Sequence, residues 1–461
     1  MAQSKCTTKP SLVFTVTRQA PEYISPAKLT PYEFKELSDI DDQGSLRFHI
    51  PIIQIYRNDE TSGGALRGQD PAKVLKEAVS KALVFYYPLA GRLREKAGGK
   101  LVVECNGEGI LFIEAYADVT LHEFGDNLVP PFPCLDELLF DVPGSTELLD
   151  TPLMLIQVTK LKCGGFIVGL RYNHTFADAP GLVLLMNAIA ELAPGLQSPS
   201  TLPVWDRHIF SARTTPQVTY HHHEYDVVSD LDGTTTIPTD EPVHKSFFFG
   251  PKEIVALRRF LPAHQKATTF ELLSAFLWRC RTIALRPDAE ELVRFICLSN
   301  FRYRFPHLFP SGYYGNGFGL PVAISTASKL TGNPIEYAVN LVQKAKEAVT
   351  PEFVNSLPDF LVLNNRPCFT AQGAFLVSDV TKAGLENVDY GWGLPVYSGP
   401  AKAGFGNMMP ISFNVAFKNE KGEKGILVLI CLPEDAMQIF VKEINGLLGK
   451  GSPPFYMSSS L

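Results

Sequence analysis

The residues best suited to chemistry are a histidine and an aspartate four positions apart, His174 and Asp178. An imidazole titrates near neutral pH, so it can take a proton from a hydroxyl group and give it back. A nearby carboxylate can orient an imidazole, as the third group of a catalytic triad does. Alternatively, Asp178 could cap the helix that follows it, or form an ion pair with an arginine elsewhere. The spacing therefore suggests proton transfer at His174 and leaves the role of Asp178 open.

The elements around this pair would place His174 at a corner between a strand and a helix. Apolar residues alternate over 166–172, which predicts a strand buried on at least one face. A preceding segment, 155–161, has a similar pattern and predicts the other strand of a hairpin. Pro180 suits the first turn of a helix, and apolar residues follow at helical spacing up to Leu192. A rigid scaffold on both sides would fix the reach of a general base.

The chain has 461 residues, which exceeds the size of one ordinary core and predicts two domains. Strand and helix patterns alternate, so the class is mixed α/β. Residues 194–242 are polar and Pro-rich, and we expect them to form a long linker. The predicted domains are therefore 1–193 and 243–461, with part of 370–400 packing against the N-terminal domain.

Charge and composition argue against several classes of protein. The formal net charge is -6, and no basic run is present, so we expect no nucleic-acid partner. The longest apolar runs are too short to cross a bilayer. Eight cysteines are scattered without a CxxC pair, which favours a reduced compartment and disfavours a zinc site. We therefore expect a cytoplasmic protein without a bound metal, and we interpret His221–His223 as part of a solvated loop. We also expect the protein to be a monomer.

Two short sequences bear on location. A formal N-glycosylation site spans 173–175, and a glycan there would block the corner described above, which agrees with the cytoplasm. The last residues, Ser459–Leu461, loosely resemble a peroxisomal address but lack its basic residue.

A second unusual segment is Asp389-Tyr390-Gly391-Trp392-Gly393. Glycines on both sides of a tryptophan suggest a tight backbone path around a large buried ring. We interpret it as a structural turn, with a direct catalytic role of Asp389 as the alternative. The chain has no G-x-S-x-G elbow, no Walker motif and no complete dinucleotide fingerprint, so no bound cofactor is expected.

The two motifs, in this order and about two hundred residues apart, resemble the plant BAHD acyltransferase family. Further segments fit the family and cover nearly the whole chain, namely 87–92, 106–109, 269–278, 300–302 and 314–316. Segments 37–42, 86–94 and 312–316 look like the branch of alcohol acyltransferases that make volatile esters, which includes benzyl alcohol O-benzoyltransferases.

The resemblance implies two chloramphenicol-acetyltransferase-like domains, joined by a crossover loop, with an active-site channel between them. It implies that His174 is the general base and that Asp178 pairs with Arg302. The second motif would support the structure, although its aspartate, Asp389, is sometimes treated as a second proton acceptor. Two positions depart from the family pattern: Tyr390 replaces a phenylalanine, and only Ser378 remains of a Thr-Ser-Trp run that can support the reaction.

The implied reaction moves an acyl group, such as benzoyl or acetyl, from an acyl-CoA co-substrate to a benzyl or aliphatic alcohol, without a covalent enzyme intermediate. Three alternatives stay open. The acceptor could be a larger specialised-metabolite hydroxyl or an amine, and the chain could be a catalytically silent binding relative. A peptide-bond-forming condensation domain shares the fold, but its motif has paired histidines where this chain has Asn173 before His174.

Overall fold

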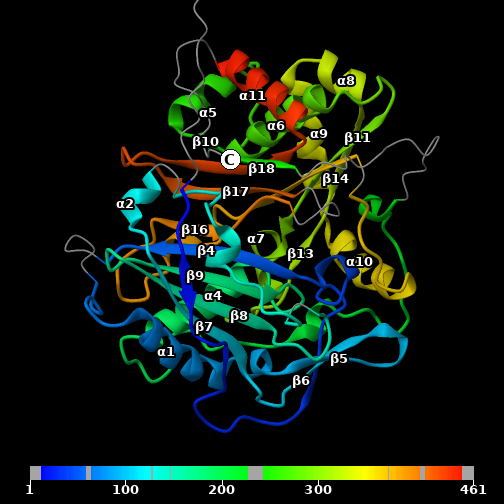
Figure 1. Ribbon diagram of the computed structural model, residues 1–461. Helices are drawn as coiled ribbons and strands as arrows, with labels where there is room; N and C mark the ends of the chain where they lie inside the picture. Colours follow the sequence, from blue (N-terminus) through cyan, green and yellow to red (C-terminus); the bar gives the residue numbers. More distant parts are fainter. Residues whose placement is uncertain are drawn as a thin grey trace, which may run out of the picture.

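Two large β-sheets lie against each other and form the frame of the molecule (Figure 1). The computed structural model describes residues 12–58, 64–125, 128–145, 147–226, 242–371, 373–404 and 411–448. One continuous cluster of buried residues contains members of both sheets, including Ile53, Leu376 and Phe413. The mixed α/β class expected from the sequence is confirmed.

The first sheet has seven strands, ordered β1-β7-β8-β9-β4-β16, with β2 also paired to β7. Its last strand, β16, comes from the C-terminal part of the chain and pairs antiparallel with β4. The division into domains at residues 193 and 242 stays a prediction. The strands are β1 (Val16–Arg18), β2 (Glu22–Ile24), β4 (His49–Tyr56), β7 (Ile110–Ala117), β8 (Met154–Leu161), β9 (Phe166–Asn173) and β16 (Tyr397–Pro400).

The second sheet has six strands, ordered β10-β18-β17-β15-β11-β14. Strand β15 is parallel to both of its neighbours, β11 and β17, and the other pairs are antiparallel. The strands are β10 (Val243–Phe249), β11 (Leu292–Cys297), β14 (Val322–Thr326), β15 (Ala374–Asp379), β17 (Ile411–Lys418) and β18 (Lys424–Leu432).

Helices cover the outer faces of the two sheets, as Figure 1 shows. The longer ones are α1 (Pro71–Phe85) and α4 (Ala179–Leu192) by the first sheet, and α5 (Pro251–Arg258), α6 (Thr269–Leu285), α9 (Ile335–Glu347) and α11 (Glu434–Leu448) by the second. Helix α10 (Pro351–Leu363) lies to one side. Helix α6 begins with a capping box between Thr268 and Glu271, and its buried face packs against α9 and α11.

Smaller elements complete the frame around the junction of the sheets. A two-stranded ribbon pairs β12 (Ser299–Asn300) with β13 (Phe318–Gly319), and α7 (Phe301–Arg304) follows β12 directly. A three-stranded sheet contains β3 (Phe34–Glu36), β5 (Arg92–Glu95) and β6 (Leu101–Glu104). Short helices α2 (Leu121–Phe124), α3 (Leu135–Leu138) and α8 (Ala327–Gly332) connect longer elements.

The predicted corner at His174 is present. Strands β8 and β9 form an antiparallel hairpin in which Val158 faces Val168. Helix α4 begins one residue before Pro180, and Asp178 is its N-cap residue. Because β9 is an interior strand between β8 and β4, the position of His174 at its end is fixed from both sides.

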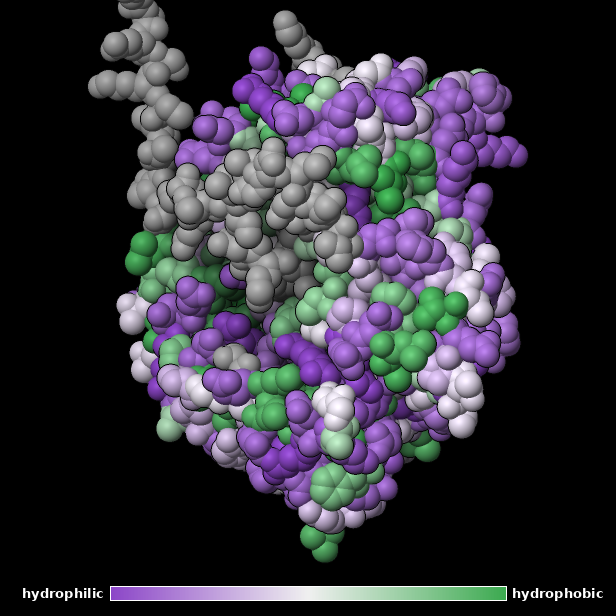
Figure 2. Space-filling model, turned by 90° about the vertical axis from the view of Figure 1, so that its right-hand side faces the viewer, coloured by the Kyte–Doolittle hydropathy of each residue, from purple (hydrophilic) through white to green (hydrophobic). Residues whose placement is uncertain are grey.

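Figure 2 shows one side of the molecule coloured by hydropathy. On this side, hydrophobic residues form small groups that are separated by hydrophilic side chains, and no single large apolar face is visible. Among the helices of the described residues, none combines the length and apolar character needed to cross a membrane.

Candidate active site

His174 borders a cavity of about 100 Å³ that lies where the two sheets meet. Its backbone N–H donates to the carbonyl of Phe48 at 2.8 Å, which ties the corner to the start of strand β4. Most of the lining is apolar and comes from both sheets, including Ile50 and Ile52 on one side and Leu376, Ile411 and Phe413 on the other. The cavity therefore places a proton acceptor against a largely water-excluding wall.

The imidazole of His174 is 7% exposed and lies among the aromatic rings of Phe48, Tyr172 and Phe318. Burial lowers the pKa of His174 below its usual value, and the nearby carboxylates of Asp178 and Asp41 only partly oppose this. A neutral imidazole at physiological pH is the form that a general base requires.

This pKa direction predicts the pH dependence of the reaction. The base is active when deprotonated, so activity is present above its pKa and is lost as the pH falls through it. Since burial lowers that pKa, we expect the acidic limb of kcat/KM to have its midpoint below the usual histidine value of about 6.5. The measurement is a kcat/KM profile over roughly pH 5 to 8 with a non-ionising alcohol. A midpoint clearly above that value would contradict the assignment of this limb to His174.

Asp178 turns away from the imidazole and bonds to three other groups. Its Oδ1 accepts the N–H of Gly181 at 3.0 Å, so it caps helix α4. Its Oδ2 accepts from the guanidinium of Arg302 at 2.5 Å and from the N–H of Gly317 at 3.0 Å. Two of the three roles considered from the sequence, helix cap and ion pair, are thus combined in this one side chain. The third role, orientation of the imidazole, has no support here, because the described contacts of Asp178 include no hydrogen bond to the ring of His174.

Several polar side chains share the cavity wall with His174, namely Gln43, Ser45, Asp178, Asn300, Ser378 and Asp379. Ser378, at the end of strand β15, is 6% exposed and lines the cavity. Asn300 also lines it, and its Oδ1 accepts the N–H of Arg302 at 2.9 Å. The side-chain amide N–H groups of Asn300 and the hydroxyl of Ser378 are donors of the kind that can stabilise an oxyanion. Sequence reasoning named Ser378 but gave no such role to Asn300.

The second motif closes a turn away from the cavity. Asp389 is exposed, and its Oδ1 accepts the N–H groups of Gly391 and Gly393 at 2.7 and 2.8 Å. Both glycines have positive φ angles, of 106° and 89°, which only glycine adopts readily. Asp389 is not among the residues that line the cavity with His174, so a proton-acceptor role would require it to leave this turn.

The large side chains of this motif are buried behind the first sheet. Trp392 is 1% exposed and packs edge to face on Phe166 at 5.1 Å. The hydroxyl of Tyr390 donates to Oε1 of Gln54 at 2.9 Å, so the group that departs from the family pattern has a partner. The motif thus joins the segment after β15 to strands β4 and β9.

Sequence reasoning missed three polar residues that pack behind His174. Asp41, Arg207 and Asn316 are at most 2% exposed, and they come from segments far apart in the chain. Arg207 belongs to the predicted linker, where its guanidinium donates to Asp41 at 2.9 Å and to the carbonyl of Phe176 at 2.8 Å. Only the three aspartates of segment 37–42, which are interleaved with Leu37 and Ile40, hinted at buried ion pairs.

The histidine triplet differs from its interpretation as a solvated loop. His221 and His223 are exposed and each bonds to Asp226 at 2.8 Å, as residues on the same side of an extended chain can. His222 points the other way, is 3% exposed, and bonds to the buried Glu224 at 3.1 Å. The sequence interpretation was therefore wrong for His222.

Comparison with known proteins identifies the family. The Transferase family model matches residues 14–447. Benzyl alcohol O-benzoyltransferase of Nicotiana tabacum is 59% identical over 444 residues, which cover 96% of this chain and 95% of that protein.

Solved structures share the fold. Vinorine synthase aligns with a TM-score of 0.73 at 22% identity, covering 94% of this chain and 98% of that one. The F. graminearum TRI101 structure, a complex with coenzyme A and deoxynivalenol, aligns with a TM-score of 0.66 at 16% identity, covering 88% and 96%. These likenesses confirm the expected mixed α/β fold of two chloramphenicol-acetyltransferase-like domains. The chain therefore belongs to the Transferase family, the BAHD acyltransferases, and is an acyltransferase.

Proposed function

We propose that this enzyme transfers an acyl group from a CoA thioester to the hydroxyl of a small alcohol, with His174 as the general base. The observation that carries the proposal is the buried imidazole of His174 at the wall of an apolar cavity lined by both sheets. The relative from tobacco acts, by its name, on benzyl alcohol, and its identity over almost the whole chain supports the same reaction type here.

In the proposed reaction, the alcohol oxygen attacks the thioester carbonyl while Nε2 of His174 takes the hydroxyl proton. A C–O bond forms, and the tetrahedral oxyanion is stabilised by donors in the wall, for which Ser378 and Asn300 are candidates. The C–S bond then breaks, and His174 returns the proton to the leaving thiolate. The products are an ester and free CoA, and no covalent enzyme intermediate forms. Binding both reactants beside one base supplies much of the rate.

The size of the cavity bears on the substrates. Its volume of about 100 Å³ is of the order of an engineered 150 Å³ cavity that binds benzene. One aromatic ring or a short aliphatic chain is of comparable size, so we infer that the group held beside His174 on at least one of the two reactants is small. This supports a benzyl or aliphatic alcohol and a benzoyl or acetyl donor over a bulky polycyclic hydroxyl or amine.

Release of free CoA thiol tests the proposal. Purified protein is offered acetyl-CoA or benzoyl-CoA against benzyl alcohol, short aliphatic alcohols and a polycyclic alcohol. We expect alcohol-dependent release with the small acceptors and at least about 10-fold lower kcat/KM with the polycyclic one, since a poorly fitting group costs about 1–3 kcal/mol. Equal rates with the polycyclic alcohol would contradict the inferred substrate size. No release with any pair, together with measurable CoA binding, would instead identify a silent binding relative.

Location and assembly are part of the same proposal. The cysteines of the described residues, such as Cys105 and Cys280, are all unpaired, which supports a reducing compartment such as the cytoplasm. Asn173 of the formal glycosylation site is 1% exposed and bonds to the hydroxyl of Thr175 at 2.7 Å, so a glycan has no access. The C-terminal Ser459–Leu461 lies outside the described residues. We propose that the enzyme acts as a monomer.

A further inference from the structure

The side chain of Asn316 packs directly behind His174. Its Nδ2 donates to the backbone carbonyl of His174 at 2.9 Å. Both Oδ1 of Asn316 and Nδ1 of His174 are buried, and within the described part of the chain neither has a hydrogen-bond partner. One amide group therefore anchors the backbone of His174 and carries a second polar atom, Oδ1, that has no hydrogen-bond partner among the described residues. Such a pair of buried, unsatisfied atoms needs an explanation.

The orientation of the Asn316 amide is fixed by its partners. Nδ2 of Asn316 also donates to Oδ1 of Asp41 at 2.8 Å, and the backbone N–H of Asn316 donates to the same oxygen at 2.9 Å. A carboxylate and a carbonyl can only accept, so the group that contacts both must be the NH₂. The remaining atom, Oδ1, is therefore an acceptor and can receive a hydrogen only from another donor.

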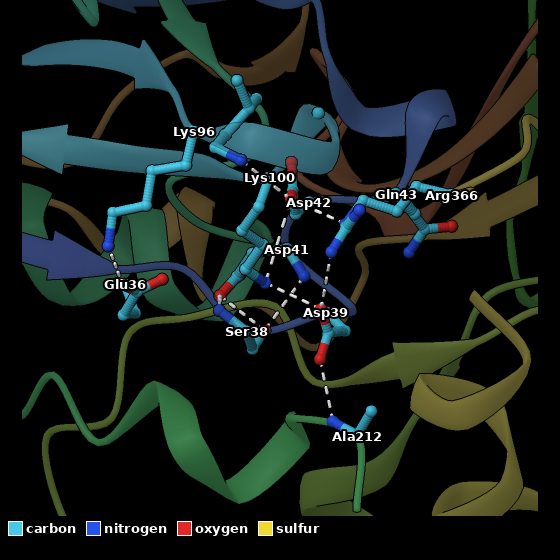
Figure 3. Close-up of polar contacts among 12 residues, drawn as sticks. Glu36, Ser38, Asp39, Asp41, Asp42, Gln43, Lys96, Lys100, Ala212 and Arg366 are labelled. Atoms are coloured by element: carbon cyan, nitrogen blue, oxygen red, sulfur yellow. Dashed lines mark hydrogen bonds and ion pairs between the residues drawn. The ribbon is translucent and has the colours of Figure 1, made fainter. Parts of the chain in front are cut away.

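Asp41 is itself held firmly. It is fully buried, and it accepts from the hydroxyl of Ser38 at 2.6 Å and from the guanidinium of Arg207 at 2.9 Å. Figure 3 shows how the loop that carries it is tied down on both sides. Asp39 contacts Lys100 at 2.7 Å and the N–H of Ala212 at 2.8 Å, and Asp42 contacts Arg366 at 2.9 Å. The network is fully paired at the carboxylates, so it is rigid.

We propose that Asn316, held by Asp41, is a positioning residue for His174: its Oδ1 accepts the Nδ1–H of the imidazole, so that Nε2 keeps its lone pair for the alcohol. The inference rests on the proposed role of His174 as the base. Hydrogen bonds of catalytic groups are often long or poorly aligned before substrate binds. Burial lowers the pKa of His174, while hydrogen bonding to the backbone carbonyl of His174 itself, the carboxylates of Asp178 and Asp41, and hydrogen bonding to Asn316 raise it. The contribution of Asn316 agrees with an interaction between the two side chains, and the carbonyl of His174 is a second acceptor that the tautomer measurement must separate from it.

Other charged or titratable groups also surround the imidazole and must be considered in any test based on pH. They are Asp178 after β9 with its partner Arg302 on α7, Asp41 with its partner Arg207, Asp379 at the end of β15, and the phenol of Tyr172. The carboxylates of Asp178 and Asp41 raise the pKa of His174. Asn316→Ala leaves all these charges in place, so its effect on the pH profile reports the lost amide.

The test combines kinetics with ¹⁵N NMR of protein labelled at histidine, in which His174→Ala assigns the resonance. In the wild type we expect a neutral imidazole with its proton on Nδ1. In Asn316→Ala we expect a shift toward the Nε2-protonated tautomer, a kcat lower by about 10–100-fold, the usual effect of removing the partner of a functional histidine, and an acidic limb of kcat/KM displaced to lower pH. Asp41→Asn should change all three quantities in the same direction.

Gln157→Ala is the matched control. Gln157 is also a fully buried amide with backbone and hydroxyl partners, but it lies on β8 and does not line the cavity. It should lower stability and leave the tautomer and the pH profile unchanged. If Asn316→Ala and Asp41→Asn behave like this control, the proposal is overturned. If the wild type releases no CoA with any substrate pair, the proposed function fails, and the tautomer measurement still decides the role of Asn316.

Discussion

Replacing His174 with alanine is expected to lower turnover by about 10²–10⁴-fold, the usual contribution of a positioned general base. The imidazole of His174 borders the cavity, and a neutral base there removes the hydroxyl proton as the C–O bond forms. Without it, the proton must go to water or stay on the attacking oxygen. The measurement is the rate of CoA thiol release at saturating benzyl alcohol and acyl-CoA. Binding should change little, because the apolar lining of the cavity remains.

His49→Ala is the matched control for this prediction. His49 lies at the start of strand β4, directly opposite Asn173 in the sheet, and burial lowers its pKa as it does that of His174. It lies among other residues, including Arg171 and Pro152, and does not line the cavity that contains His174. We expect turnover of this variant to stay close to that of the wild type. Near-normal turnover of His174→Ala, or an equal loss in both variants, would remove His174 from the mechanism.

The corner that presents His174 could be predicted because short-range patterns encode it. Alternating apolar residues specify strands β8 and β9, and Pro180 with the apolar spacing after it specifies α4. Each of these patterns acts over a few residues, so no knowledge of distant partners is needed. The ion pair between Asp178 and Arg302 spans 124 positions, and it was expected only because the family resemblance implied it.

The support behind His174 could not be predicted, because it depends on contacts between distant segments. Asp41 and Arg207 are 166 positions apart. The polar composition around Arg207 suggested a long linker, yet its guanidinium is buried between Asp41 and the ring of Trp205, whose centroid is 4.3 Å away. Burial of a charge is favourable only with such a partner, and composition alone does not reveal which partner the fold will bring.

Asp389 shows the converse limit of prediction from sequence, in which a motif suggests a catalytic role that the structure does not support. The aspartate of the matching family motif is sometimes treated as a second proton acceptor, which made a catalytic role of Asp389 worth considering. In the structure its carboxylate accepts two backbone N–H groups of its own turn, at Gly391 and Gly393. Turn geometry of this kind depends on the positive φ angles of the glycines. We therefore expect Asp389 to matter for folding of the turn rather than for proton transfer.

Asp178→Asn is expected to lower the free energy of unfolding by about 3–5 kcal/mol, because it leaves the guanidinium of Arg302 without its carboxylate. The two side chains are 6% and 16% exposed. An asparagine can still cap helix α4 at Gly181, so the loss reports mainly the ion pair. The measurement is denaturant unfolding, with Lys76→Met as control, since Lys76 and Glu22 form an exposed pair worth at most about 1 kcal/mol.

A double-mutant cycle separates the structural role of Asp178 from an action on the imidazole. Arg302→Met should be destabilising on its own, and the double variant should lose less than the sum of the single losses, because neither charge is then left unpaired. Turnover should fall in step with stability, since the pair joins the start of α4 to α7 beside the cavity. If Asp178→Asn lowers kcat while stability stays unchanged, Asp178 acts on His174 rather than on the frame. The ion pair with Arg302 would then not be the main role of Asp178.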